Sequence, residues 1–270
     1  MSGLATAVDE LTADVDGVLL FTTDQSTYER FADSDLPVIV VGTENAVGAE
    51  SYVSLPLGFS APSERVRFGI EGAINQGLLT EDEEVIGLTQ SFSESRLDTV
   101  VRVRTDEFTQ TGVYDLFVNS RADAEVVRDV FEVAIELGRK GQKGKPVGAL
   151  FVVGDAGNVM NKSRPLSYNP FEKSHVDVGD PIVNVMLKEF SRLDGAFVIS
   201  DSGKIVSAYR YLEPGAEGVE IPKGLGARHM AGGAITRDTT AVAIVLSESD
   251  GMVRAFKAGS LVLELDPEAY

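Results

Sequence analysis

A glycine-rich loop followed by two basic residues is the strongest indication of a functional site in this sequence. The segment reads Gly224-Leu225-Gly226-Ala227-Arg228-His229 and leads into a predicted helix that ends near residue 235. Unpaired N–H groups and the helix dipole make a helix N-terminus attractive to anions. A cation such as Arg228 is unfavourable in that first turn unless an anion binds there. The loop therefore predicts a phosphate-binding site.

Two further short motifs place carboxylates at the ends of predicted strands. Asp194-Gly195-Ala196 precedes a strand predicted over 196–200, and Ser247-Glu248 follows one predicted over 241–246. Small residues allow a ligand to approach the backbone, and strand ends are where ligands meet open sheets. Taken alone, either acid could instead serve only to cap or solvate a turn.

The composition excludes several kinds of site. The formal net charge is −18, which disfavours binding to a nucleic-acid backbone. The chain has no cysteine and only two histidines, so thiolate sites and multi-histidine metal cages are excluded. Its apolar runs are far shorter than the ~18 residues of a membrane span, and its acidic N-terminus lacks a secretory pattern. We therefore expect a cytoplasmic protein without a membrane partner.

The acidic residues are spread over the whole chain rather than collected in a tail, and arginine outnumbers lysine. This distribution favours adaptation to a high-salt cytosol, and the alternative is an ordinary acidic soluble protein. A halophilic protein of this kind is expected to need salt for folding, because its surface charges repel one another at low ionic strength.

The first half of the chain predicts an α/β domain over residues 1–119, with a doubly wound, mostly parallel sheet. Apolar runs at 17–21 and 37–41 flank a helical segment at 25–32, as in a parallel βαβ unit. A helix at 63–78 and strands at 84–88 and 99–103 follow. The segments 75–79, 85–88 and 99–103 resemble the C-terminal domain of pyruvate kinase, which implies a regulatory or assembly role rather than catalysis.

The second half, residues 120–270, predicts a second α/β domain with a mixed, twisted central sheet. Ser120 is a candidate cap for a helix at 122–139, and Asp180-Pro181 is a typical start for a helix that reaches 193. The basic segment 140–145 lacks the order of a phosphate loop and is interpreted as a solvated connection. Strands are predicted at 148–153, 196–200, 205–209, 241–246, 252–256 and 261–265, with hairpin turns at 201–203 and 250–251.

Together, Asp194-Gly195-Ala196, Leu225-Gly226-Ala227-Arg228-His229 and Ser247-Glu248 resemble the signature of diadenylate cyclase domains, and the resemblance extends from about residue 122 to 265. With the first half, the chain resembles the soluble archaeal type of this enzyme, and its acidity would suit a haloarchaeon. The resemblance implies a nucleotidyltransferase that condenses two ATP molecules into cyclic di-AMP and pyrophosphate.

The resemblance also implies roles for individual residues. Asp194 would bind a metal and orient or deprotonate the attacking 3′-hydroxyl, and Glu248 would assist at the metal. Arg228 and His229 would hold the triphosphate. The remaining nucleotide-binding positions would be Gly195, Ala196, Tyr211, Leu212, Gly226, Ala227 and Ser247, with Tyr211 and Leu212 beside the adenine.

Charge develops on phosphoryl oxygens in such a reaction, so a divalent metal is expected, and oxygen ligands suit Mg²⁺ or Mn²⁺. Because cyclic di-AMP is two-fold symmetric, two domains that each hold one ATP must face each other. A homodimer is therefore expected, and a higher homo-oligomer is an open alternative.

Three positions depart from the family pattern: Ala227 replaces a usual threonine, Met230 a usual arginine and Ser249 a common second acid, for which Asp250 is a possible substitute. Two alternatives remain open, and only the first of them rests on these departures. One is a nucleotide sensor without turnover, and the other is a metal-dependent phosphate-ester hydrolase that uses Asp194 and Glu248.

Overall fold

The computed structural model describes residues 14–34, 36–55, 62–92, 96–108, 113–118, 120–141, 146–191, 194–213, 215, 222 and 224–268. The chain divides into two compact units, Met1–Tyr114 and Asp115–Tyr270, whereas the sequence predicts a boundary after residue 119. Within the described ranges, no helix has both the length and the apolar character that crossing a membrane requires.

The first unit contains a mostly parallel sheet with the strand order β3-β2-β1-β4-β5. Strands β3, β2, β1 and β4 are parallel to one another, and β5 runs antiparallel to β4. The strands are β1 (Gly17–Leu20), β2 (Val38–Gly42), β3 (Tyr52–Ser54), β4 (Glu84–Thr89) and β5 (Thr99–Arg104). The helices are α2 (Gln25–Ala32), α3 (Pro62–Asn75) and the 3₁₀ turn η1 (Thr105–Phe108), and the short helix α4 (Val113–Val118) spans the division between the two units.

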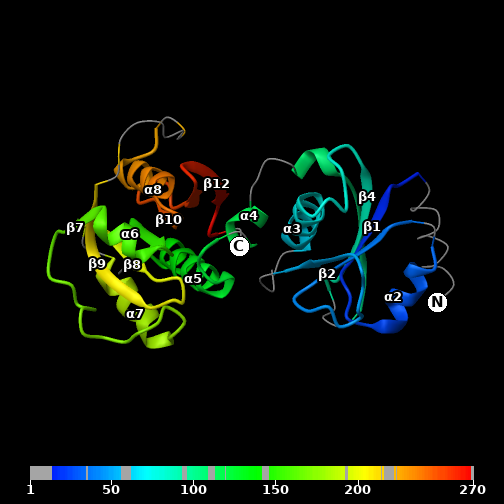
Figure 1. Cartoon of the computed structure of the whole chain (residues 1–270), viewed down its shortest axis with the longest axis horizontal. Helices are drawn as coiled ribbons and strands as arrows, with labels where there is room; N and C mark the ends of the chain where they lie inside the picture. Colours follow the sequence, from blue (N-terminus) through cyan, green and yellow to red (C-terminus); the bar gives the residue numbers. More distant parts are fainter. Residues whose placement is uncertain are drawn as a thin grey trace. The chain divides into compact units, whose positions relative to one another are not determined.

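Helices cover both faces of this sheet, as Figure 1 shows for α2 and α3. Alternate residues of β1 point to opposite faces. Val18 and Leu20 pack against Tyr28 and Phe31 of α2, while Leu19 lies beneath Gly69 of α3. The predicted doubly wound arrangement is therefore confirmed.

The second unit contains a mixed sheet with the strand order β12-β11-β10-β6-β8-β9-β7, in which β6 and β8 are parallel and the other pairings are antiparallel. The strands are β6 (Ala149–Val153), β7 (Ser163–Pro165), β8 (Ala196–Ile199), β9 (Ile205–Leu212), β10 (Val242–Leu246), β11 (Val253–Lys257) and β12 (Ser260–Leu265). The helices are α5 (Ala124–Lys140), α6 (Ala156–Asn161), α7 (Pro181–Phe190) and α8 (Ala227–Asp238).

Helices cover this sheet on both faces as well. Leu150 and Val152 of β6 share a buried cluster with Val159 of α6 and Ile235 of α8. Helix α5 also contacts β6, β10 and β11, but its buried residues are absent from that cluster, so it packs on the opposite face, where it meets α7. The predicted α/β class with a mixed central sheet is confirmed.

Local predictions were right where side-chain patterns were strong and wrong at one cap. Asp180 accepts a hydrogen bond from the backbone N–H of Ile182 and begins α7 with Pro181 in its first turn, as predicted. Ser120 does not cap α5, because the helix begins after Asp123, and the Ser120 hydroxyl instead accepts a hydrogen bond from the Ala122 N–H. Most of the basic segment 140–145 lies outside the described residues.

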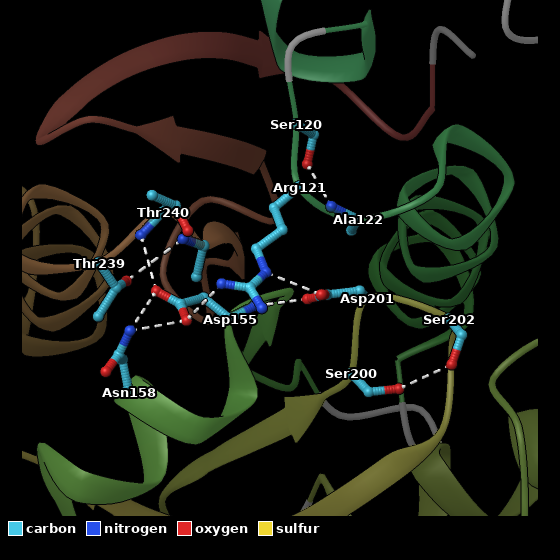
Figure 2. Close-up of polar contacts among 11 residues, drawn as sticks. Ser120, Arg121, Ala122, Asp155, Asn158, Ser200, Asp201, Ser202, Thr239 and Thr240 are labelled. Carbon is cyan, nitrogen blue, oxygen red and sulfur yellow. Dashed lines mark hydrogen bonds and ion pairs between the residues drawn. The ribbon is translucent and has the colours of Figure 1, made fainter.

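The end of the sheet at which β6 and β8 finish is closed by a polar network. In Figure 2 the guanidinium of Arg121 reaches between Asp155 and Asp201, at 3.2 and 2.8 Å. The buried Asp155 carboxylate also accepts hydrogen bonds from the Asn158 side chain and the Thr240 N–H, at 2.9 and 3.1 Å. These contacts tie the start of α6, the turn after β8 and the start of β10 to the segment before α5.

Candidate functional site

Every residue that the sequence predicts for the site lines one cleft of about 950 Å³ in the second unit. The cleft lies at the opposite end of the sheet from the Arg121 network, where β6 and β8 begin and the antiparallel β10 ends. Its lining comprises Asp194, Gly195, Ala196, Tyr211, Leu212, Gly226, Ala227, Arg228, His229, Ser247 and Glu248, together with Leu150, Leu166, Arg210, Ala231, Leu246 and Ser249.

Strand order brings these separate segments together. Asp194 and Gly195 precede β8, Ser247 and Glu248 follow β10, and β6 lies between those two strands. Helix α8 begins at the same end, where Gly226 is its N-cap and offers no capping side chain. The first N–H groups of that helix thus remain available to an anion in the cleft.

Arg228 connects the two predicted metal-binding acids. Its Nη2 lies 3.2 Å from Asp194 Oδ1 and its Nη1 lies 3.4 Å from Glu248 Oε2. The side chains of Asp194 and Glu248 are 91% and 62% exposed, while that of Arg228 is 32% exposed. The guanidinium therefore balances the charge of two carboxylates that are otherwise open to solvent.

The lack of a side chain at Gly195 is a requirement of the fold. Its φ is +108°, and a Cβ placed there would lie 2.7 Å from the Cα and carbonyl carbon of Tyr209. Tyr209 itself has a φ of 57°, at an irregularity in the pairing of β8 with β9. Gly195 lines the cleft as predicted, but the neighbouring backbone of β9 explains the glycine, rather than the approach of a ligand.

His229 is a buried, unprotonated part of the cleft wall. It is 4% exposed, and burial and the nearby Arg254 guanidinium hold the pKa of His229 below its ordinary value. Its Nε2 lies 3.5 Å from Arg254 Nη1, and its Nδ1 has no hydrogen-bond partner among the described residues. His229 can therefore contribute a polar N–H or lone pair to a ligand, whereas the positive charge at this wall comes from Arg228.

Asp250 is not available as a second acid of the cleft. Its carboxylate accepts hydrogen bonds from both terminal nitrogens of Arg254, at 3.3 and 2.8 Å, and it is absent from the lining. These bonds lower the pKa of Asp250, so the carboxylate is committed to an ion pair. Ser249, by contrast, does line the cleft, and its hydroxyl lies 3.2 Å from that of Ser247.

Tyr211 and Leu166 form an apolar part of the cleft lining. Tyr211 is 49% exposed, and the Arg164 guanidinium lies 4.7 Å from the centre of its ring. Arg164 in turn forms an ion pair with Glu213, with Nε of the arginine 2.7 Å from Oε1 of the glutamate. Leu166, which is 46% exposed, lines the cleft beside them. Sequence patterns missed Leu166 and Arg164, because strand β7 is too short and polar to be predicted.

The donor set suits a metal ion that arrives with a substrate. Among the described residues, no group of three or more His, Asp or Glu side chains is placed to hold a metal ion. The cleft offers two carboxylates, Asp194 and Glu248, which contact the same guanidinium. Mg²⁺ is commonly held by one or two carboxylates, with waters and substrate phosphates as its other ligands. The cleft residues fit such an ion, although they do not form a complete protein cage.

The matching family models and the curated relatives agree on one family. Residues 1–125 match the family model "Diadenylate cyclase, N-terminal", and residues 136–261 match "DisA bacterial checkpoint controller nucleotide-binding". A diadenylate cyclase of Haloferax volcanii is 68% identical over the full length of both chains. One from Methanocaldococcus jannaschii is 40% identical over 74% of this chain and 66% of its own. A crystal structure of DacA from Staphylococcus aureus covers 54% of this chain and 89% of its own, at 24% identity and a TM-score of 0.36.

Proposed function

This chain belongs to the diadenylate cyclase family, nucleotidyltransferases that make cyclic di-AMP from ATP, and we propose that the cleft around Arg228 is where it does so. The observation that carries this proposal is the meeting of three separate segments at one end of the sheet. They supply a helix N-terminus, a guanidinium and two exposed carboxylates around one cleft. That combination suits a nucleoside triphosphate better than it suits an uncharged ligand.

Each wall of the cleft has a part in binding ATP under this proposal. The N–H groups at the start of α8 and the Arg228 guanidinium bind the triphosphate, with Ser247 and His229 as further polar contacts. Tyr211 and Leu212 lie beside the adenine. Met230, which is 47% exposed in the first turn of α8, stands where the family usually has an arginine, so one positive charge is missing in that turn.

The reaction is an in-line substitution at phosphorus. The 3′-oxygen of one ATP forms a bond to the α-phosphorus of the other, and the bond from that phosphorus to the β-phosphate oxygen breaks, so that pyrophosphate leaves with the electron pair. Asp194 accepts the proton of the 3′-hydroxyl, and the same exchange in the opposite direction closes the ring. Because Asp194 is exposed to the cleft, its carboxylate can reach a hydroxyl that belongs to a second nucleotide.

Asp194 and Glu248 would also hold Mg²⁺ or Mn²⁺ together with the substrate phosphates. When bound, such an ion neutralises charge on the phosphoryl oxygens and so lowers the barrier to attack.

A second copy of the chain completes the site in this proposal. One cleft holds one ATP, and a two-fold symmetric product requires two clefts that face each other. The exposed apolar side chains of Leu166 and Tyr211 at the cleft support this arrangement, because a facing copy would cover them.

The test is product analysis after incubation with ATP and Mn²⁺ or Mg²⁺ in molar KCl. We expect cyclic di-AMP and pyrophosphate from the wild type, and a loss of at least ~100-fold in Asp194→Asn, since general base catalysis contributes about that much. Asp266→Asn, an exposed aspartate outside the cleft, is the matched control and should retain activity. Bound but unreacted ATP would instead indicate a nucleotide sensor, and ADP or AMP would indicate a hydrolase.

A further inference from the structure

Gly148 lies directly behind the Arg228 guanidinium. It is the buried residue that precedes β6, between the end of β10 and the start of β8. A Cβ built on Gly148 would lie 2.6 Å from Arg228 Nη1 and 3.2 Å from Arg228 Cζ. It would also lie 3.1 Å from the Cβ of Glu248. The space that a side chain would need at this position is thus taken by the two cleft residues themselves.

The backbone at this position does not require glycine. Gly148 lies outside the left-handed region, in contrast to Gly195 with its φ of +108°. At Gly195 an added Cβ would meet the backbone of Tyr209, whereas at Gly148 it would meet the mobile end of one side chain and the Cβ of another. Alanine at 148 therefore needs no unusual backbone conformation, but the Cβ of Glu248 must shift by a few tenths of an ångström and Arg228 cannot keep its position.

We propose that Gly148 is a positioning residue of the cyclase site, whose missing side chain lets the Arg228 guanidinium lie between Asp194 and Glu248. The inference rests on the proposed function of Arg228 in holding the triphosphate. The guanidinium crosses the start of β6 at close range and reaches a carboxylate on each side, at 3.2 and 3.4 Å. A methyl group at 148 moves it away from the sheet and breaks this alignment.

The experiment is a double-mutant cycle between Gly148→Ala and Arg228→Ala. Two quantities are measured for each protein: kcat/KM for cyclic di-AMP formation, and the Kd for the non-reactive analogue α,β-methylene ATP. In the wild-type background, Gly148→Ala is expected to lower kcat/KM by about 10- to 100-fold and to weaken analogue binding, as expected for a misplaced charge-assisted contact. In the Arg228→Ala background the same methyl is expected to change either quantity by less than about threefold, because the guanidinium is gone and only the looser contact with the Cβ of Glu248, at 3.1 Å, remains.

Gly157→Ala is the matched control. Gly157 lies in α6 of the same unit, and a Cβ there would meet nothing within 4 Å. This variant should keep wild-type kinetics, and all variants should unfold within a few degrees of the wild type, on the order expected for substitutions without strain.

The outcomes separate this inference from the proposed function. Equal losses from Gly148→Ala in both backgrounds would show a general structural effect, and wild-type behaviour of Gly148→Ala would show that Arg228 needs no cleared space. Either result overturns the inference. If the wild type binds the analogue but makes no cyclic di-AMP, the proposed function is overturned. The double-mutant cycle can still be measured through the Kd for the analogue, and it then decides the role of Gly148. A wild type that binds no analogue overturns both.

Discussion

Replacing Gly195 by alanine should destabilise the second unit, whether or not nucleotide is present. The added Cβ would lie 2.7 Å from the Cα and carbonyl carbon of Tyr209 and 2.9 Å from the Arg210 nitrogen. All three are backbone atoms of a neighbouring strand, so they can move only if the pairing of β8 with β9 changes. Alanine must also adopt a φ of +108°, which L-residues rarely do.

The magnitude follows from these two effects. A residue in a sparsely populated backbone region costs about 1–3 kcal/mol, and an overpacked methyl costs about as much again. Loss of glycine entropy from the unfolded chain offsets about 0.4–1 kcal/mol of this. The net loss is about 1–6 kcal/mol, which for a domain of this size lowers Tm by roughly 2–20 °C.

The assay is thermal unfolding by calorimetry or circular dichroism, without ligand, in molar KCl. Gly226→Ala is the matched control, because Gly226 lines the same cleft with a φ of −79° and a Cβ there would meet nothing within 4 Å. We expect this control to unfold within about 2 °C of the wild type, since an N-cap change from glycine to alanine costs less than ~1 kcal/mol.

A Gly195→Ala protein that unfolds at the wild-type temperature but no longer binds nucleotide would refute the reasoning. That result would mean that Gly195 is needed for the approach of a ligand, as its position in the sequence first suggests, and that β9 yields readily to the added methyl.

Three further predictions concern His229, salt and assembly. The pKa of His229 is lowered in the folded protein, so the stability that the neutral imidazole contributes is complete above about pH 6.5, the ordinary pKa of histidine, and is lost as the pH falls toward the lowered pKa. When Tm is measured from pH 7.5 to 5, it should therefore fall less in His229→Gln than in the wild type. With a net charge of −18, Tm should rise from low salt to molar KCl, and a flat Tm would contradict a role for charge repulsion. Specific activity should fall on dilution as a dimer dissociates, so activity that is independent of concentration would exclude a site shared between copies.

Much of the fold could be predicted because its strands are continuous apolar runs bounded by turn residues. The runs at β1, β2, β6 and β10 are buried along nearly their whole length, and the Asp250-Gly251 turn joins β10 to β11 as expected. Helix α6 and strands β3 and β7 were not predicted. They are too short to show a period, and Pro165 in β7 argues against a strand.

The members of the site could be predicted, but several of their contacts could not. Motif order identified the lining residues, yet only the placement of β6 between β8 and β10 brings Asp194 and Glu248 to the same guanidinium. In the sequence Asp250 was a possible substitute for the second acid that is missing at Ser249, and the buried Arg254 on the adjacent strand decides against it. No sequence pattern points to Gly148. Its importance depends on the Arg228 side chain, which fills the space beside it only in the folded structure.

The acidic side chains at the two ends of the second sheet differ in how many hydrogen-bond and ion-pair partners they have. This difference affects which substitutions the protein can accept during evolution. At the end shown in Figure 2, Asp155 is buried and has several donors, so a substitution there leaves other charges unpaired. At the cleft end, Asp194 and Glu248 are exposed and depend on one arginine. Substitutions of these two carboxylates therefore cost little in folding, so catalytic properties can change at these positions while the fold is kept. The departures at Ala227 and Met230 lie at that tolerant end.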